Sequence, residues 1–461
     1  MNKYNLDDTI AAIATPIGEG GIGIVRLSGK DALNIADKIF LSCDGKRSSG
    51  FKAYTTHYGW IVNKSRDIVD EVLLTVMRAP RSYTKEDVVE INCHGGVVAL
   101  RAVLELVLAQ GCRVSQAGEF TKRAFLNGRI DLAQAEAVLD TIRAKTDSAL
   151  RSSLGQLKGS LSKEINNIRE PLLEVLSILE ANIDFPEDDV SPAGINDIRL
   201  KLESVCFKLK EILVSSRQGR VLREGINVVI CGKPNVGKSS LLNAILKQER
   251  SIVTPIAGTT RDTIEEIVDI RGIPVRLADT AGILKPRNIV EKKAVQRAKD
   301  CIASADLVFL LFDGSKSLSK EDRELIRKVK NKTVLAIINK IDLKQKINKP
   351  QITEVFKNII EISAKRIKNI HILEDALVNL VYRGKIGLSE SALVSNLRHI
   401  EALKKAQKLI EEARVSLDNK LHIELVAQSI KDALSHLDDI LGKQFSEDLL
   451  DKIFSDFCIG K

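Results

Sequence analysis

The spacing of hydrophobic and polar residues divides the chain into parts of different character. Up to about residue 118, short apolar runs of the kind found in β-strands alternate with glycines. Four such runs lie at 10–14, 23–27, 72–76 and 88–91. The spacing also predicts one helix over 97–110, which Gly111 ends. This mixture predicts an N-terminal α+β domain.

Beyond residue 129 the apolar positions follow the period of a helix. From Leu150 to Ile183 they recur every three or four residues, which predicts one long amphipathic helix that ends at the acidic segment 184–189. A second helix is predicted over 198–213. Toward the C-terminus, further helices are predicted over 393–417, 421–441 and 448–457.

Between these helical parts, strand-like apolar runs are each followed by a polar or glycine-containing motif, which is typical of a parallel sheet covered by helices. Either one helical domain is interrupted by this inserted domain, or unrelated parts follow one another along the chain. Insertion is the more economical interpretation, because the helical pattern lies on both sides. The predicted fold is multi-domain α/β plus α, with domains at 1–118, 119–220, 221–382 and 383–461.

The most informative motif is Gly-Lys-Pro-Asn-Val-Gly-Lys-Ser at 232–239. It follows the apolar run 226–230 and precedes a predicted helix at 241–246, which is the strand–turn–helix context of a phosphate-binding P-loop. In such a loop backbone N–H groups surround the phosphates, Lys238 neutralises charge and the Ser239 hydroxyl reaches Mg²⁺. The motif therefore predicts a nucleotide switch.

Three further motifs, each at the end of an apolar run, indicate a guanine nucleotide. In the motif Asp-Thr-Ala-Gly at 279–282, Asp279 can hold the Mg²⁺ shell and Gly282 can offer its N–H to the γ-phosphate. The motif Asn-Lys-Ile-Asp ends at Asp342, whose carboxylate can accept from N1 and the 2-amino group of guanine, a donor pair that adenine lacks. Ser-Ala-Lys at 363–365 would complete the base pocket. The predicted GTP contacts are Asn235, Val236, Gly237, Lys238, Ser239, Ser240, Thr254, Pro255, Ile256, Ala257, Gly258, Thr259, Thr260, Asp279, Thr280, Ala281, Gly282, Asn339, Lys340, Asp342, Ser363, Ala364 and Lys365.

Three positions bear on hydrolysis. Thr260 lies where switch I belongs and is a candidate Mg²⁺ ligand. Asn235 either offers its side-chain oxygen near the phosphates or is a simple turn residue. Ile283 stands where Ras-like switches carry the glutamine that positions water, so another group must orient the water.

Composition sets broad limits. A length of 461 residues corresponds to about three domains, and a hydrophobic content of 44% suffices for ordinary cores. The net charge of +9 favours a polyanionic partner, although a solubilising surface charge would give the same balance. The seven cysteines include no Cys-x-x-Cys pair, which argues against a zinc knuckle or a disulfide framework. We expect no signal peptide, no membrane span and a cytoplasmic location.

Nearly the whole chain resembles the MnmE (TrmE) family of tRNA-modification GTPases. The resemblance rests on the P-loop, on Ala-Gly-Thr-Thr-Arg-Asp at 257–262, on Asp-Leu-Ala-Gln-Ala-Glu-Ala at 131–137 and on Cys-Ile-Gly-Lys at 458–461. Segments 86–90, 94–96 and 118–127 are similar to the family as well. Several GTPases share the P-loop and Thr-Thr-Arg-Asp, but the combination with this C-terminus points to one family.

The resemblance implies a potassium-dependent GTPase that is activated when two G domains meet. The cation would supply positive charge where it develops, as an arginine finger does elsewhere. Ser239 and Thr260 would hold Mg²⁺, and Glu291 would orient the attacking water through a bridging water. Without the resemblance, Glu291 would simply begin a helix over 291–298. The implied K⁺ ligands are Asn235, Thr254, Ile256 and Thr259.

The resemblance also implies that the N-terminal domain is similar to folate-binding domains and mediates dimerisation. It would bind 5-formyl- or methylene-tetrahydrofolate through Arg26, Glu90 and Arg129, with Lys461 contributing from the C-terminus. Relatives carry lysine where this chain has Arg129, so the charge is kept and the reach differs. Considered alone, Arg26 and Glu90 would be an ordinary strand-surface pair.

Cys458 has two open interpretations. Its thiol could attack C6 of a uracil ring and so activate C5, which fits uridine-C5 chemistry. Alternatively, the tail that contains it simply closes over the folate pocket.

The function that the resemblance implies is GTP hydrolysis coupled to modification of C5 of the wobble uridine in certain tRNAs. The product would be an aminomethyl or carboxymethylaminomethyl group, made by a homodimer together with an FAD-dependent partner of the MnmG (GidA) type. Two alternatives remain. A ribosome-assembly GTPase would carry an RNA-binding module instead of the folate-like domain, and a scaffolding switch would have no affinity for folate.

Overall fold

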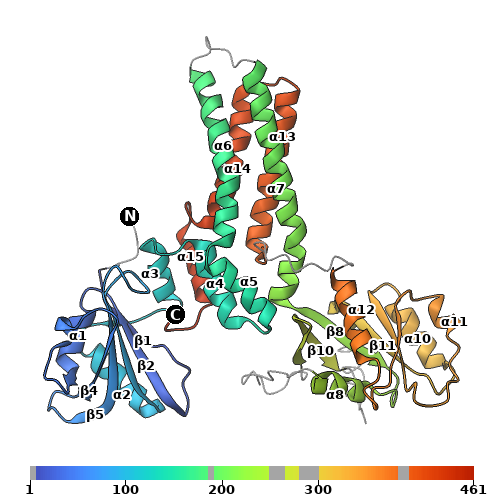
Figure 1. Ribbon diagram of the computed structural model, residues 1–461, viewed down its shortest axis with the longest axis horizontal. Helices are drawn as coiled ribbons and strands as arrows, with labels where there is room; N and C mark the ends of the chain where they lie inside the picture. Colours follow the sequence, from blue (N-terminus) through green and yellow to red (C-terminus); the bar gives the residue numbers. More distant parts are fainter. Residues whose placement is uncertain (1–6, 185–191, 249–264, 280–300, 383–393) are drawn as a thin grey trace. The chain divides into compact units, whose positions relative to one another are not determined.

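The computed structural model describes residues 7–184, 192–248, 265–279, 301–382 and 394–461 (Figure 1). Contacts divide the chain into two compact units, Met1–Leu139 with Ser435–Lys461, and Asp140–Leu434. The first unit therefore contains both ends of the chain. Within the described residues, no helix combines the length and the apolar character that crossing a membrane requires.

The first unit contains a seven-stranded sheet in the order β3-β4-β5-β6-β2-β1-β7. Neighbouring strands are antiparallel except β1 and β7, which are parallel. The sheet confirms the predicted α+β domain. The strands are β1 (Ile10–Ile13), β2 (Gly20–Ser28), β3 (Phe40–Ser42), β4 (Thr55–Val62), β5 (Ile68–Met77), β6 (Val88–Gly95) and β7 (Arg113–Val114).

One face of this sheet is the core of the domain. The helices α1 (Ala32–Ile39) and α2 (Val97–Leu108) contribute buried apolar side chains to the same cluster as the strands. On β5, Val72, Leu74 and Val76 are buried, whereas the alternate residue Leu73 is exposed. This period of two places successive side chains on opposite faces of the sheet.

A second cluster in this unit joins α3 (Glu119–Leu126), the start of α4 (Leu132–Arg143) and α15 (Glu447–Ser455). Beside it, Arg123 is 2% exposed and donates to three carboxylates. Its guanidinium lies 2.5 Å from Asp8 Oδ1, 3.1 Å from Glu86 Oε1 and 3.1 Å from Glu119 Oε1. Burial of an arginine is tolerated here because both terminal nitrogens donate to these carboxylates, although Nε has no hydrogen-bond partner within the described residues.

The second unit contains a bundle in which four long helices run side by side (Figure 1). These are α6 (Ser160–Asp184), α7 (Pro192–Glu224), α13 (Leu397–Asp418) and α14 (Ile423–Leu441), of which the last is shared with the first unit. Apolar residues at helical spacing are buried along them, such as Ile165 and Leu172 on α6. The first two helices precede the nucleotide-binding segment in sequence and the last two follow it. One helical domain with an insertion is therefore confirmed.

The single helix predicted across 150–183 is two helices. The chain forms α5 (Asp147–Leu157) and then α6, which begins at Ser160. Gly159 adopts φ +88°, a left-handed conformation that ends a helix and that glycine adopts without steric cost. The prediction was wrong because Leu157 and Leu161 keep helical spacing across the break.

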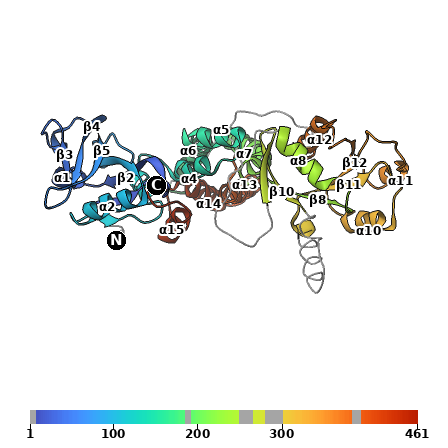
Figure 2. The ribbon, with the colours of Figure 1, turned by 90° about the horizontal axis from the view of Figure 1, so that it is seen from below.

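The inserted domain contains a six-stranded sheet in the order β13-β12-β11-β8-β10-β9. All neighbours are parallel except β9 and β10, which form an antiparallel hairpin. Figure 2 shows α8 and α12 on one face and α10 on the other. The elements are β8 (Ile226–Gly232), α8 (Lys238–Gln248), β9 (Glu265–Ile270), β10 (Ile273–Asp279), β11 (Leu307–Asp313), α10 (Lys320–Val329), β12 (Val334–Asn339), α11 (Pro350–Thr353), β13 (Ile359–Glu361) and α12 (Ile370–Tyr382).

Candidate functional site

The P-loop connects β8 to α8 at the carboxyl edge of the parallel sheet, where ligands of such folds bind. Asn235 has φ +65° and Gly237 has φ +103°, so the loop turns sharply before α8 begins. Lys238 is buried, and its Nζ donates to the carbonyls of Gly232 (2.9 Å) and Lys233 (2.8 Å). The lysine is thereby held against the loop that would surround the phosphates.

Asn339, at the end of β12, connects the motifs of the base pocket to the P-loop. Its Nδ2 donates to the Val236 carbonyl at 2.8 Å. Its Oδ1 accepts from the backbone N–H groups of Lys340 (2.8 Å) and Ala364 (2.9 Å). This side chain is 2% exposed, so its role in the described structure is to hold three segments together.

Gly237 makes this arrangement possible. A Cβ at this position would lie 2.3 Å from Asn339 Nδ2, which is closer than two such atoms can approach. Positive φ adds a second reason for glycine. The P-loop and the base-recognition strand therefore approach as closely as they do only because residue 237 has no side chain.

Asp342 is oriented by the third motif. Ser363 Oγ donates to Asp342 Oδ1 at 2.6 Å, and this hydrogen bond is the main cause that lowers the pKa of the carboxyl below its usual value. Asp342 is therefore ionised at neutral pH. An ionised carboxylate is the acceptor that the N1–H and 2-amino groups of guanine require.

Lys340 fixes the loop on the other side of the base pocket. Its Nζ lies 2.7 Å from the Asn235 carbonyl and 2.7 Å from Asp313 Oδ2. Burial opposes ionisation of Asp313, but hydrogen bonds from Lys340 and Ser315 outweigh it and lower the pKa. Sequence reasoning missed Asp313. Its position at the end of the buried run 307–313, at the same sheet edge as the motifs, was the available signal.

The P-loop together with Asn339, Lys340 and Asp342 lines a cavity of about 650 Å³, which is in the size range of ligand sites. The cavity brings together predicted residues from three separate parts of the sequence, and adds Pro234 and Leu343, which were not predicted. Its lining is Pro234, Asn235, Gly237, Lys238, Ser239, Ser240, Asn339, Lys340, Asp342, Leu343 and Lys365.

The described residues also offer positions for cations. Ser239 is exposed in the first turn of α8 and lines the cavity, so its hydroxyl fits a Mg²⁺ ion that takes its other ligands from phosphate oxygens and water. Asp279 ends β10 directly beside Ile230 of β8, next to the P-loop. The predicted residues Thr254, Pro255, Ile256, Ala257, Gly258, Thr259, Thr260, Thr280, Ala281, Gly282 and Glu291 lie outside the described residues.

A second candidate site lies in the first unit, around Arg26. Arg26 on β2 and Glu90 on β6 are opposite each other in the sheet register, and Arg26 Nε donates to Glu90 Oε1 at 2.8 Å. Arg26 also donates to the Gly460 carbonyl at 3.2 Å. Its guanidinium lies 5.8 Å from the centre of the Tyr83 ring, and that of Arg129 lies 4.6 Å from the same ring.

The C-terminal tail is bound to the first unit by backbone contacts. Ala117 and Ile459 form an antiparallel bridge, and the Phe120 N–H donates to the Lys461 carbonyl at 3.2 Å. Cys458 is exposed beside these contacts. The predicted residues Arg26, Glu90, Arg129 and Lys461 are thus close in space around Tyr83 and Phe120. Sequence reasoning assigned neither aromatic residue to the site, although Phe120 lies in the family-like segment 118–127.

The fold and the loop geometry together define a P-loop GTPase domain inserted into a helical domain. Two family models match the chain: the MnmE helical domain over residues 132–458 and the GTP-binding protein TrmE N-terminus over residues 9–129.

Two curated relatives are named tRNA modification GTPase MnmE. The protein of Clostridioides difficile is 48% identical over 99% of this chain and 100% of its own length. That of Alkaliphilus oremlandii is also 48% identical over 99% of this chain and 100% of its own length. The chain belongs to the MnmE family of tRNA-modification GTPases.

Among solved structures, Aquifex aeolicus Era bound to GDP·AlF4⁻ is 31% identical over 40% of this chain and 66% of that chain. The TM-score is 0.27, a likeness too limited to carry an argument of its own.

Proposed function

We propose that this protein is a K⁺-dependent GTPase that modifies C5 of the wobble uridine of certain tRNAs in the cytoplasm. It would act as a homodimer with an FAD-dependent partner of the MnmG type and would use a tetrahydrofolate one-carbon donor. An aminomethyl or carboxymethylaminomethyl group would be the product. Membership of the MnmE family supports the proposal over a ribosome-assembly or scaffolding GTPase.

In the G domain, the hydroxyls of Ser239 and Thr260 would hold Mg²⁺ between them and the phosphates. Asn235 with Thr254, Ile256 and Thr259 would coordinate K⁺, which supplies positive charge near the α- and γ-phosphates. Glu291 would orient the attacking water through a bridging water, because Ile283 has no polar group for that task. The exposure of Asn235 at the edge of the cavity supports its assignment.

In the first unit, the observation that carries the folate proposal is the contact of Arg26 with both Glu90 and the C-terminal tail. Arg26, Arg129 and Lys461 would meet the acidic tail of a folate, and Glu90 would accept from the N–H groups of its pterin. The folate would supply the one-carbon unit, and the flavoprotein partner would supply the redox chemistry.

The outward face of the N-terminal sheet supports the proposed dimer. Tyr58 on β4 and Leu73 on β5 are paired in the register and are 42% and 45% exposed. Leu41 on β3 is 42% exposed and pairs with Trp60, which neighbours Tyr58 on the same face. Adjacent exposed apolar residues on one sheet face are typical of a protein–protein contact.

Cys458 keeps its two roles in this proposal, as nucleophile or as part of a closing tail. Its exposure is compatible with both. Substitution Cys458→Ser separates them, because a nucleophile would be lost whereas a closing tail would still bind folate and support modification.

Nucleoside mass spectrometry of tRNA tests the proposal. Cells that lack this protein should accumulate wobble uridine without the C5 group, and the native gene should restore it, whereas Arg26→Ala should not. Ultrafiltration with 5-formyl-tetrahydrofolate should show retention by the native protein and loss of retention in Arg26→Ala. The proposal would be contradicted if the wobble uridine of the deletion strain still carried its C5 group, or if the native protein retained no folate.

A further inference from the structure

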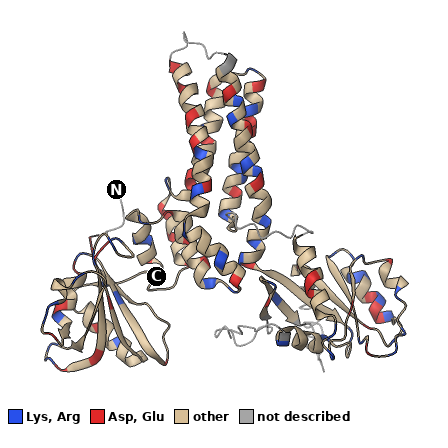
Figure 3. Ribbon diagram, in the orientation of Figure 1, with Lys and Arg blue, Asp and Glu red and all other residues tan. Residues whose placement is uncertain are grey.

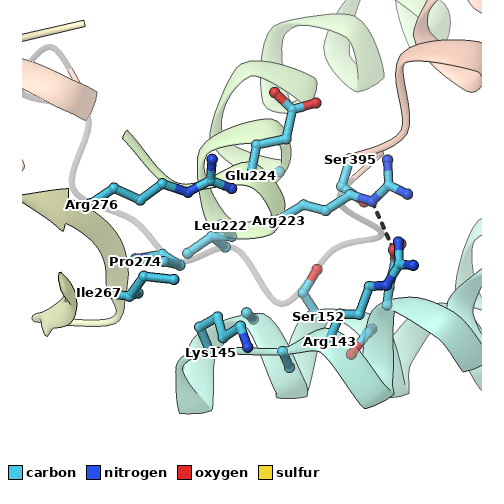
Figure 4. A pocket seen from close by; sticks show the side chains of 15 residues that line it. Arg143, Lys145, Ser152, Leu222, Arg223, Glu224, Ile267, Pro274, Arg276 and Ser395 are labelled. Carbon is cyan, nitrogen blue, oxygen red and sulfur yellow. Dashed lines mark hydrogen bonds and ion pairs between the residues drawn. The ribbon is translucent and has the colours of Figure 1, made fainter. Parts of the chain in front are cut away.

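A cavity of about 410 Å³ lies in the second unit, away from the nucleotide motifs (Figure 4). It is bounded by the end of α4, by α5, by the last turns of α7, by the strands β9 and β10 and by Ser395 before α13. Four cationic side chains line it: Arg143, Lys145, Arg223 and Arg276. Figure 4 shows them reaching the cavity from separate parts of the chain.

The two carboxylates of the lining are neutralised by their own arginine partners. Asp140 Oδ1 accepts from Arg223 Nε at 2.8 Å, and Glu224 Oε2 accepts from Arg220 Nε at 2.7 Å. Lys145 and Arg276 are exposed, and their side chains have no ion pair or hydrogen bond within the described residues. The cavity therefore has an excess of positive charge, with two cationic groups available to a ligand.

The other polar groups of the lining suit a phosphate. Ser152, Ser153 and Ser395 add hydroxyls, and hydroxyls together with guanidinium and ammonium groups are the usual side-chain partners of phosphate oxygens. The lining contains two carboxylates, and each already accepts a hydrogen bond from an arginine. A metal cation would therefore find no set of oxygen ligands in this cavity. An anionic ligand is favoured over a cationic one.

Arginines continue along α7 beyond this cavity, into a second hollow that also contains the carboxylates of Glu224 and Asp306. Arg217, Arg220 and Arg223 follow one another at intervals of three residues on α7, which places them along one side of the helix. Arg217 and Arg220 line a neighbouring hollow of about 360 Å³ that shares Glu224 with the first cavity. Figure 3 marks lysine and arginine in blue on α4, α5 and α7. The net positive charge therefore lies in the first cavity, and arginines spaced along the adjoining helix suit phosphates spaced along a chain better than one small anion.

We propose that the cavity lined by Lys145 and Arg276, continued by the arginines of α7, binds backbone phosphates of the tRNA substrate. This inference rests on the proposed function, because it takes the tRNA from there. It adds the position at which the phosphate backbone of the tRNA binds, at the junction of the helical domain and the inserted G domain.

The test is tRNA binding by a double variant, Lys145→Gln with Arg276→Gln, in the full-length protein saturated with GDP. The matched control is Arg327→Gln with Lys404→Gln, which removes the same charge from exposed positions on α10 and α13 outside the cavity. The probe is an unmodified transcript of a tRNA with uridine at the wobble position, followed by fluorescence anisotropy between 50 and 200 mM KCl, on the order of the range over which phosphate contacts are salt-sensitive.

We expect the cavity variant to bind tRNA at least about tenfold more weakly near 0.1 M salt, because two phosphate contacts and the counterion release that accompanies them are lost. The slope of log affinity against log salt should fall by about 1 to 2. The control variant should match the native protein, and both variants should keep native GDP binding and thermal midpoints.

Equal tRNA affinity and slope in the cavity variant and the native protein would overturn the inference, as would an equal loss in the control variant. Calorimetry with inorganic tripolyphosphate provides the second arm. If tripolyphosphate binding depends on Lys145 and Arg276 while tRNA binding does not, the cavity takes a free anion and the tRNA assignment is wrong. A native protein that binds no tRNA would instead refute the proposed function, and this inference with it.

Discussion

Replacing Gly237 by alanine should disconnect the P-loop from the base pocket. An added Cβ would lie 2.3 Å from Asn339 Nδ2, so Asn339 must move. Its three hydrogen bonds, to Val236 and from Lys340 and Ala364, contribute about 0.5 to 1.5 kcal/mol each. A residue with a Cβ at φ +103° adds about 1 to 3 kcal/mol of strain.

The total, about 2.5 to 7.5 kcal/mol, divides between the stability of the G domain and its affinity for nucleotide. The strain has a matched control in Gly111→Ala, because Gly111 has φ +106° and no atom within 4 Å of the position its Cβ would take. That variant bears the strain without the contact. Because Gly111 lies in the first unit, its variant shows what such strain alone costs in thermal unfolding, and only Gly237→Ala adds the contact with Asn339.

Binding of a fluorescent GDP analogue and the thermal midpoint provide the assay. Gly237→Ala should bind GDP at least about tenfold more weakly, which corresponds to about 1.4 kcal/mol. It should also lower the thermal midpoint of G-domain unfolding, which is identified as the transition whose midpoint rises when GDP is added. Gly111→Ala should bind GDP as the native protein does. The reasoning is refuted if Gly237→Ala binds GDP within twofold of the native affinity.

Three further predictions follow from described contacts. Arg123→Met should destabilise the N-terminal domain by about 3 to 5 kcal/mol in denaturant unfolding, because it leaves Glu86 without its cation and leaves Asp8 and Glu119 with Arg113 alone; a loss under 1 kcal/mol would contradict this. The hydrogen bond to Asp70 raises the pKa of His94 above 6.5, so its stabilising contribution is complete below pH 6.5 and is lost as the pH rises through the raised pKa. In NMR titrations Asp70→Asn should lower the His94 midpoint, and an unchanged midpoint would be the contrary result. Asp342→Asn should weaken GDP binding by at least about a hundredfold, or 2.7 kcal/mol, since a charged acceptor of two donors is lost; calorimetry that finds a native affinity would exclude Asp342 from the base pocket.

The order of the domains could be predicted because the nucleotide motifs and the spacing of apolar residues place the same boundaries along the chain. Each nucleotide motif follows a buried strand, and the helical period returns after residue 393. Helix ends were less predictable. The spacing of Leu157 and Leu161 continues through Gly159, so only the backbone conformation of that glycine shows the break. The helix α7 runs to Glu224, past the predicted end at 213, although its last turns carry few apolar residues.

The sites differ in how far the sequence could predict them. The cavity at the P-loop is lined by short motifs at strand ends, so most of the residues that line it could be named from the sequence. The contact of Arg26 with Glu90 depends on the register of β2 and β6, which the sequence alone does not specify. The contribution of Gly460 depends on the last residues returning to the first domain, a long-range contact that no local pattern encodes.

GTP turnover by the purified protein in KCl and in NaCl is the most direct measurement of the central proposal. We expect strong acceleration by K⁺ that Na⁺ does not reproduce, and loss of this acceleration in Asn235→Ala with nucleotide binding nearly intact. Turnover per protein molecule should also require the dimer, because two G domains must meet for hydrolysis. Equal rates in the two salts, or K⁺ acceleration that persists in Asn235→Ala, would contradict cation-assisted hydrolysis across paired G domains.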